Sequence, residues 1–193
     1  MSTQKDTESA PLLARQALER YLCDQQTLRP PEGLADRFMR PGASFVTLHT
    51  RSDGMLRGCI GSIIAHRPLA EDIIQNAIAA AVRDPRFAPL SCEELSTVAL
   101  EVSILSAPEP LAYEQGSQLP EKIRPGVDGV ILRDGPYQAT FLPSVWGQIE
   151  DPVCFLENLC LKAGLDRNAW QSGRLEVLTY QAQVHKEPYK GPF

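Results

Sequence analysis

Residues 44–61 read SFVTLHTRSDGMLRGCIG, and this stretch predicts a β-hairpin. Its first part, residues 44–50, is rich in β-branched and aromatic side chains, and a second strand-like run follows Asp53-Gly54. An Asp-Gly pair between two such runs is a strong hairpin signal, because both residues tolerate the positive φ angles of a tight turn. We therefore expect an antiparallel pair of strands here.

The rest of the chain mixes helices and strands without a regular β-α-β alternation. Periodicity and capping signals predict helices from Pro11 to Tyr21, over 68–84, near Ser91–Glu94 (a capping-box pair) and over 152–163. Alternation and turn residues predict strands over 98–104 and 175–180, and a second hairpin at Asp134-Gly135. This order favours the α+β class, with a mostly antiparallel sheet flanked by helices.

The length of 193 residues suits a single domain over residues 1–193. We expect residues 1–9, which are polar, to form a loose tail. Residues 106–127 are rich in proline and glycine, and we expect a smaller lobe to be drawn from about 106–150.

Charge and composition exclude some functions. The net charge is −5 without a run of basic residues, which disfavours general nucleic-acid binding. No apolar run approaches the roughly 18 residues of a membrane span, and we expect no secretory signal, so a cytoplasmic location is predicted. Five widely spaced cysteines without a C-x-x-C pair predict reduced thiols rather than a disulfide framework.

The hexapeptide L-R-G-C-I-G at 56–61 could carry chemistry. In a regular strand Arg57 and Cys59 point to the same face, and a guanidinium beside a thiol favours the thiolate. Gly58 and Gly61 would let a ligand or another backbone approach closely. Cys59 and Arg57 are therefore the candidate catalytic residues, and Gly58 and Gly61 are candidate ligand-binding residues.

A general base for Cys59 is not settled by the sequence. A two-residue turn at Asp53-Gly54 would pair Leu48 with Cys59 and point His49 to the opposite face, whereas a loop longer by one residue would reverse this. His66 lies in an expected loop just beyond the motif. The competing interpretation is structural: Cys59 fills a tight space between glycines, and Arg57 pairs with an acidic residue such as Glu101.

Four further residues are candidates for ligand binding. Arg86 could clamp an anion beside Asp84, although a salt bridge over Phe87 is the simpler interpretation. Thr140 and Trp146 could line a pocket at a strand-to-helix junction, or could belong to the core. No metal site is predicted, because cysteine and histidine spacings match no known ligand pattern.

Five segments together identify a family resemblance: L-R-G-C-I-G at 56–61, D-P-R-F-A-P-L at 84–90, E-V-S-I-L at 101–105, A-T-F-L-P-S-V-W at 139–146 and F-L-E-N-L-C-L-K-A-G-L at 155–165. From about residue 12 to 182 the chain resembles the AMMECR domain family, which includes the A component of the AmmeMemoRadiSam system. The resemblance implies a two-lobed α+β fold with a cleft near residues 56–61. In microbes it also implies association with a Memo-like protein and a radical SAM protein.

The resemblance implies no agreed reaction, cofactor or catalytic set, so three functions stay open. The first is a ligand-binding or accessory component that acts with the Memo-like and radical SAM partners. The second is an enzyme that uses Cys59 as a nucleophile or redox thiol activated by Arg57. The third, disfavoured by the acidic charge, is a regulatory role linked to nucleic acid.

Overall fold

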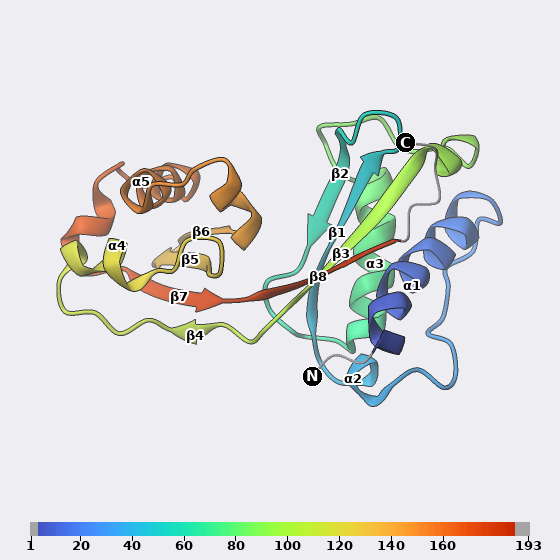
Figure 1. Ribbon diagram of the computed structural model, residues 1–193, viewed down its shortest axis with the longest axis horizontal. Helices are drawn as coiled ribbons and strands as arrows, with labels where there is room; N and C mark the ends of the chain where they lie inside the picture. Colours follow the sequence, from blue (N-terminus) through green and yellow to red (C-terminus); the bar gives the residue numbers. More distant parts are fainter. Residues whose placement is uncertain (1–3, 188–193) are drawn as a thin grey trace. The chain divides into compact units, whose positions relative to one another are not determined.

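The computed structural model describes the backbone of residues 4–187 and the side chains of residues 10–187. The chain forms two compact units, one comprising the described residues up to Leu105 and from Gln183 onward, the other Ser106–Ala182 (Figure 1). Each unit has a four-stranded antiparallel sheet with helices beside it and an apolar core of its own. The α+β class predicted from the sequence is confirmed.

Unit 1 is built around a sheet with strand order β2-β1-β3-β8, so the hexapeptide strand β2 is an edge strand. Its elements are α1 (Gln4–Leu22), α2 (Asp36–Met39), β1 (Ala43–Thr50), β2 (Leu56–Gly61), α3 (Leu69–Val82), the 3-10 helix η1 (Glu93–Thr97), β3 (Val98–Leu105) and β8 (Ala182–Lys186). The predicted first hairpin is therefore present.

The core of unit 1 lies on one face of this sheet. Alternate residues of the central strands are buried, among them Val46 on β1 and Leu100 on β3, as expected for strands with one face against a core. Helices α1 and α3 pack against one another and against these strands (Figure 1). Helix α3 buries Ile73 and Ala77, which are four residues apart and so lie on one side of the helix.

Unit 2 has the strand order β4-β7-β5-β6. Its elements are β4 (Glu109–Pro110), η2 (Gly116–Gln118), α4 (Leu119–Lys122), β5 (Gly129–Asp134), β6 (Tyr137–Phe141), η3 (Pro143–Gly147), α5 (Pro152–Lys162), η4 (Ala169–Ser172) and β7 (Glu176–Tyr180). Helix α5 contributes Phe155 and Leu159 to the core, where Trp146 stacks on Phe155 with ring centroids 3.8 Å apart.

Local turn and cap signals in unit 2 lie at or next to the positions that the sequence predicts. Asp134 is the last residue of β5 and lies opposite Tyr137, so the turn is made by Gly135 (φ +56°) and Pro136, one position later than predicted. Helix α5 ends before Gly164, whose φ of +79° is the left-handed conformation expected of a glycine just after a helix.

Two predictions about element boundaries are corrected, and one strand was missed. Helix α1 begins at Gln4 and continues through Pro11, so residues 4–9 are helical rather than a loose tail; residues 1–3 lie outside the described residues. Unit 2 extends to Ala182, whereas we expected a lobe ending near residue 150. Strand β8 follows β7 and was not predicted; Ala182 and Val184 alternate with polar residues there, but the buried residue is the polar His185.

The expectation that all five cysteines are reduced is also wrong. Cys23 and Cys92 form a disulfide in unit 1 although 69 positions separate them in the sequence. The fold brings the end of α1 beside the start of η1, with the two Cα atoms 5.1 Å apart, which is within the usual range for a bridge. Sequence spacing alone could not reveal this contact.

Candidate functional site

The register of the first hairpin decides how the hexapeptide is presented. Strand β1 ends at Thr50 and β2 begins at Leu56, so the loop is longer than two residues and Thr47, not Leu48, lies opposite Cys59. The register then shifts, because Leu48 pairs with Gly58 and the next residue of β1, His49, pairs with Leu56. Arg57 is therefore the extra residue of a β-bulge.

The bulge removes the basis for placing Arg57 and Cys59 on one face. That prediction assumed regular alternation along the strand, and a bulge interrupts alternation at the extra residue. The guanidinium of Arg57 donates to the carbonyl oxygen of Ala88 (2.9 Å) and lies 3.5 Å from Oε1 of Glu94. Its ion-pair partner is thus Glu94; Glu101, the predicted partner, pairs with Lys186 instead (3.2 Å).

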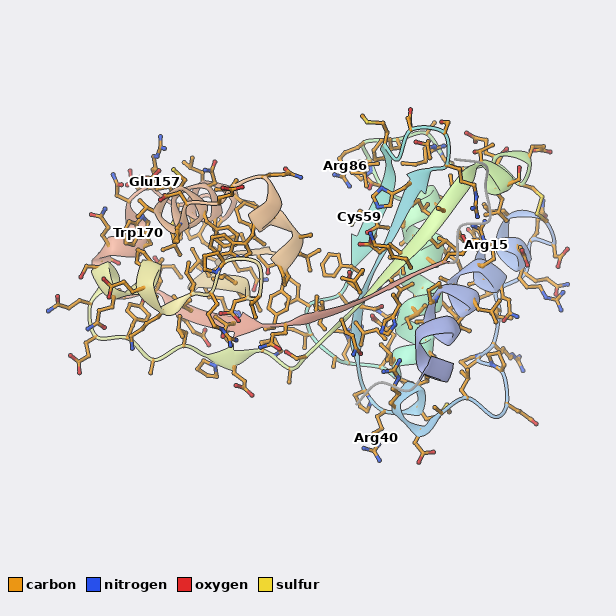
Figure 2. All side chains as sticks on the ribbon, viewed as in Figure 1. Arg15, Arg40, Cys59, Arg86, Glu157 and Trp170 are labelled. Carbon is orange, nitrogen blue, oxygen red and sulfur yellow. A yellow bond between two sulfur atoms is a disulfide. The ribbon has the colours of Figure 1, made fainter. Side chains whose placement is uncertain are left out.

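Cys59 is a free, half-buried thiol held through both its backbone and its sulfur. The Thr47 hydroxyl lies 3.4 Å from Sγ. The N–H of Cys59 points out of the sheet edge and donates to Oδ2 of Asp84 (2.9 Å). On the same edge, Nη2 of Arg86 lies 3.5 Å from the Cys59 carbonyl oxygen. Figure 2 labels the side chains of Cys59 and Arg86 in unit 1. Asp84 and Arg86 therefore take the place of a neighbouring strand at this residue.

Asp84 and Arg86 form a tight ion pair in the turn after α3. Asp84 is only 4% exposed, and its two carboxylate oxygens accept from Nε (2.9 Å) and Nη2 (2.7 Å) of Arg86. These bonds, with the one from the Cys59 N–H, hold the pKa of Asp84 well below its usual range despite burial. The carboxylate in turn raises the pKa of Arg86.

The ring of Phe87 lies beneath two guanidinium groups. Cζ of Arg86 is 5.5 Å from the ring centroid, and Cζ of Arg57 is 6.0 Å from it. Both distances suit cation–π attraction. Arg86 thus forms the salt bridge over Phe87 that the simpler interpretation predicted, while its side chain, 55% exposed, is still open to solvent. Anion binding by Arg86 stays a prediction.

The two glycines of the hexapeptide are explained by close packing within unit 1. A Cβ atom on Gly58 would lie 2.2 Å from the carbonyl oxygen of Ala80, in the last turns of α3. A Cβ atom on Gly61 would lie 2.2 Å from the ring of Phe45, its cross-strand partner. The observed neighbours of both glycines are therefore protein atoms, and ligand contact at Gly58 and Gly61 stays a prediction.

The two candidate histidines have other recorded contacts. Nδ1 of His49 lies 3.2 Å from the carbonyl oxygen of Gly54 in the hairpin loop. His66 lies in the loop after β2, where Nε2 accepts from Nε of Arg67 (3.1 Å). A role for either imidazole as a base toward Cys59 stays a prediction.

Thr140 and Trp146 lie in unit 2, and both are buried. The Thr140 hydroxyl donates to the carbonyl oxygen of Val130 (2.9 Å) and contacts the Tyr180 hydroxyl (2.9 Å). The indole N–H of Trp146 donates to the carbonyl oxygen of Asp128 (2.7 Å). These contacts fit the structural interpretation of both residues, and a ligand-binding role for them stays a prediction.

A buried polar cluster at the base of the first hairpin was missed in the sequence. Asp72 on α3 is fully buried and accepts from the N–H and hydroxyl of Ser44 (both 2.8 Å) and from the hydroxyl of Ser62 (2.8 Å). Asn76 donates to the same carboxylate (2.9 Å), and Arg67 lies 3.4 Å from it. The sequence signal for this cluster was the placement of two polar residues, Asp72 and Asn76, four positions apart on the apolar face of a predicted helix.

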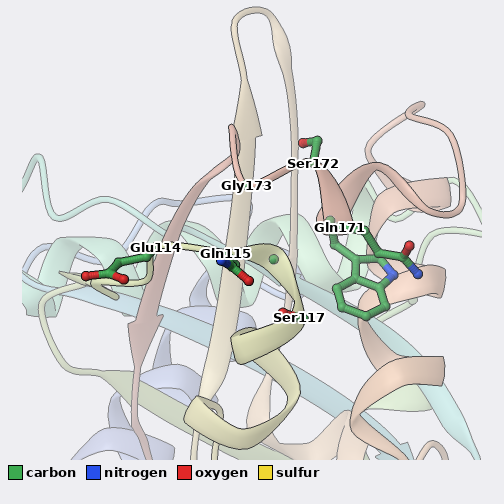
Figure 3. Close-up of a pocket in the computed structure, with 8 residues that line it drawn as sticks. Glu114, Gln115, Ser117, Gln171, Ser172 and Gly173 are labelled. Carbon is green, nitrogen blue, oxygen red and sulfur yellow. The ribbon is translucent and has the colours of Figure 1, made fainter.

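Unit 2 contains a surface pocket of about 570 Å³ that the sequence did not indicate (Figure 3). Two segments line it, residues 114–117 and 170–173, which include parts of η2 and η4 and carry polar side chains such as Glu114, Ser117 and Gln171. The segments approach closely at Gly116, where an added Cβ would lie 2.3 Å from the carbonyl oxygen of Trp170. The turn residues of these two segments carried no motif that would have predicted a pocket.

Among the described side chains, those of residues 10–187, no group of three or more histidine, cysteine, aspartate or glutamate residues is arranged to hold a metal ion. Over residues 4–187, no helix combines the length and the apolar character needed to cross a bilayer.

Comparison with known proteins gives close relatives over almost the whole chain. A protein of Thermofilum pendens is 42% identical over 188 residues, covering 91% of this chain and 86% of the relative. A protein of Methanothermobacter thermautotrophicus is 42% identical over 178 residues, covering 91% of each chain. The crystal structure of the uncharacterized protein PH0010 from Pyrococcus horikoshii matches with a TM-score of 0.89 and 36% identity, over 96% of this chain and 94% of that one.

The family profile named AMMECR1 matches residues 12–185, which include both units and the complete hexapeptide strand. The extent of this match agrees with the resemblance inferred from residues 12 to 182. The chain belongs to the AMMECR1 family.

Proposed function

We propose that this protein is a ligand-binding or accessory component that acts in the cytoplasm with a Memo-like protein and a radical SAM protein. The association with these partners rests on the family resemblance. One observation in the structure supports a role without catalysis: the charged groups nearest Cys59 are already paired. Asp84 pairs with Arg86, and Arg57 binds Ala88 and Glu94, so these contacts occupy groups that a catalytic thiol would need.

The proposal predicts that the partner proteins bind near the hexapeptide strand. Met55, in the loop just before this strand, is 64% exposed, and an exposed apolar side chain beside β2 is a candidate for a protein contact. Met39, elsewhere in unit 1, is 57% exposed and serves as a matched control. We expect Met55→Ser to weaken capture of the partners by the tagged full-length protein, while Met39→Ser leaves capture unchanged.

One outcome of this experiment counts against the accessory role, and another counts only against the proposed binding surface. If neither purified partner binds the wild-type chain, measured by co-elution in gel filtration, the accessory role loses its main support. If both partners bind and the two methionine variants bind equally well, the role survives but the binding surface lies away from β2.

The second candidate is an enzyme that uses Cys59, and one observation favours it. Cys59 is a free thiol that is half-buried rather than sealed, and a hydroxyl contacts its sulfur. The other free thiols serve as internal references. The carboxylate of Asp151 raises the pKa of the exposed Cys154, and burial raises the pKa of Cys160.

Alkylation measured residue by residue across pH separates the two functions. An activated Cys59 should react faster than Cys154 at neutral pH and should lose this advantage in Arg57→Gln or Arg86→Gln, whichever guanidinium activates it. A Cys59 that reacts no faster than Cys154, with an apparent pKa at or above about 8.5, would leave the accessory role as the better account.

A further inference from the structure

The disulfide of unit 1 lies at the surface, at the end of a segment that contacts the hexapeptide strand. Cys23, just after helix α1, is exposed, whereas Cys92, just before η1, is half-buried. An exposed disulfide sulfur can be attacked by an external thiolate, and exposed bridges are the ones that tend to be labile or regulatory.

Residues 84–94 supply the partners that hold the outer edge of β2. Asp84 and Arg86 bind the backbone of Cys59, as described above, and the carbonyl of Ala88 with the carboxylate of Glu94 binds the guanidinium of Arg57. The position of Glu94 relative to Arg57 therefore depends on how the end of this segment is anchored.

The anchors before, within and after the 91–94 turn are different in kind. Before the turn, Leu90 is buried and its N–H donates to the carbonyl oxygen of Ala81 (2.8 Å). Within the turn, Ser91 and Glu94 exchange hydrogen bonds of 3.1 and 3.3 Å, which are local and exposed. After the turn, Leu95 is buried and its carbonyl oxygen accepts from Nη1 of Arg15 on α1 (2.8 Å). The bridge from Cys92 to Cys23 is the covalent link between this turn and helix α1.

We propose that the Cys23–Cys92 disulfide is a redox latch: reduction by a dithiol loosens the 91–94 turn and releases Arg57 from Glu94. Nη1 of Arg57 stays bonded to Ala88, while Nη2, released from Glu94, becomes available to an anionic group of a ligand or partner. This inference does not depend on the proposed function, because it concerns the state of Arg57 and not the chemistry of Cys59.

The exchange reaction balances without any further reactant. A thiolate of the dithiol attacks Sγ of Cys23, which forms a mixed disulfide and breaks the protein bridge, and Cys92 leaves as a thiolate that takes up a proton. The second thiol of the dithiol then attacks the mixed disulfide and releases Cys23. The protein gains two electrons and two protons, and the dithiol becomes a disulfide.

The latch can be tested by the rate at which phenylglyoxal modifies Arg57 in the full-length chain, with peptide mapping. The Cys154→Ser background removes an exposed thiol that could exchange. Reduction with dithiothreitol should raise the rate at Arg57 by about tenfold, equivalent to about 1.4 kcal/mol in the free energy of local opening. Arg174, an exposed arginine of unit 2, should react at an unchanged rate.

A matched variant separates the latch from general loosening. Glu94→Gln weakens the ion pair while the disulfide stays intact, so Arg57 should already react faster in the oxidised variant, and reduction should then add little. If reduction of this variant still raises the rate as much as in wild type, the disulfide does not act through Glu94 and the latch is wrong.

A second measurement covers the case in which a variant does not fold. Amide hydrogen exchange of the reduced wild-type protein should be faster over residues 91–95 than in the oxidised form, with no change over 129–141 in unit 2. Two results overturn the proposal: resistance of the bridge to dithiothreitol without denaturant, or equal exchange and equal Arg57 reactivity in the confirmed reduced and oxidised forms.

Discussion

The two Asp-Gly hairpins share a turn signal, yet they are held in different ways. In unit 2, Asp134 and Tyr137 face one another and the ladder continues in regular register. In unit 1, the loop after Thr50 is longer, a bulge displaces Arg57, and the strand is fixed from outside by α3 and the 84–86 turn. The dipeptide therefore locates a turn, while packing against other elements decides the register.

The two sheets also share one kind of cross-strand pair, which lies within the hairpin in unit 1 and joins β5 to β7 in unit 2. In each sheet an aromatic ring lies over a cross-strand glycine: Phe45 over Gly61 in unit 1, and Tyr180 over Gly129 in unit 2. Such pairing supports a strand at a glycine and is independent of the turn type. The features that distinguish β2 are thus the contacts of its outer edge with Asp84 and Arg86 and the polar cluster around Asp72. Its cross-strand pairs are not distinctive.

The comparison can be tested unit by unit, because both tryptophans of the chain, Trp146 and Trp170, lie in unit 2. Tryptophan fluorescence during urea unfolding therefore reports on unit 2, whereas far-UV circular dichroism reports on both units. A variant in the first hairpin should shift the dichroism transition and leave the fluorescence transition in place if the units unfold independently.

The largest effect is expected at the base of the first hairpin. Asp72→Ala leaves the Ser44 N–H and the side chain of Asn76 buried without their acceptor, and we expect it to lower the free energy of unfolding by about 4 kcal/mol. Thr140→Val removes a buried hydroxyl from the second hairpin and should cost only about 1 kcal/mol. If both variants lose the same free energy of unfolding in urea, the buried polar groups of the two hairpins contribute equally to stability.

Gly58→Ala should destabilise unit 1 by about 3 kcal/mol, because the new methyl group meets a backbone carbonyl that cannot move without α3. Gly61→Ala meets the ring of Phe45, which can tilt, so we expect a smaller loss of about 1–2 kcal/mol. Thermal unfolding of the two variants ranks them, and a larger loss at Gly61 would contradict the close approach of α3 to β2.

Asp84→Asn tests the outer edge through its pH dependence. The pKa of Asp84 is lowered in the folded state, so the ionised carboxylate stabilises the fold above the unfolded value of about 4, and this contribution is lost as the pH falls toward the lowered value. At pH 7 we expect a loss of about 2 kcal/mol relative to wild type. In urea unfolding, the difference in the free energy of unfolding between wild type and Asp84→Asn should become smaller below about pH 4. If this difference is the same at every pH, the carboxylate is not ionised in the fold.

The smallest effect should be the same in both hairpins. Gly54 and Gly135 have φ angles of +70° and +56°, and no atom lies within 4 Å of an added Cβ at either position. Gly54→Ala and Gly135→Ala should therefore each cost about 1 kcal/mol, through backbone strain alone. A much larger loss for one of them, measured by urea unfolding, would show that its turn makes contacts beyond the backbone.

Much of the fold followed from local patterns in the chain. The helices α3 and α5 and the glycine after α5 lie where periodicity and turn residues predicted them, and the second hairpin turns one position later than predicted. The exchange of hydrogen bonds between Ser91 and Glu94 also matches the predicted capping pair. These features involve residues a few positions apart, whose conformational preferences act over that range.

The candidate site was less predictable, because its contacts join distant parts of the chain. Cys59 was identified as the central residue, but its backbone partners Asp84 and Arg86 were weighed separately from it. The predicted pair of Arg57 and Cys59 assumed a regular strand, and a one-residue bulge was enough to redirect the guanidinium to Ala88 and Glu94.

Local preferences and motifs within single segments were enough to predict the α+β class, the approximate position of both turns, the main helices and the family. The register of β2, the partners of Arg57 and Cys59, and the Cys23–Cys92 bridge became known from the folded chain. Those features depend on how closely α1, α3 and the 84–94 segment pack against one sheet, and packing between segments tens of residues apart leaves no periodic signal in the sequence.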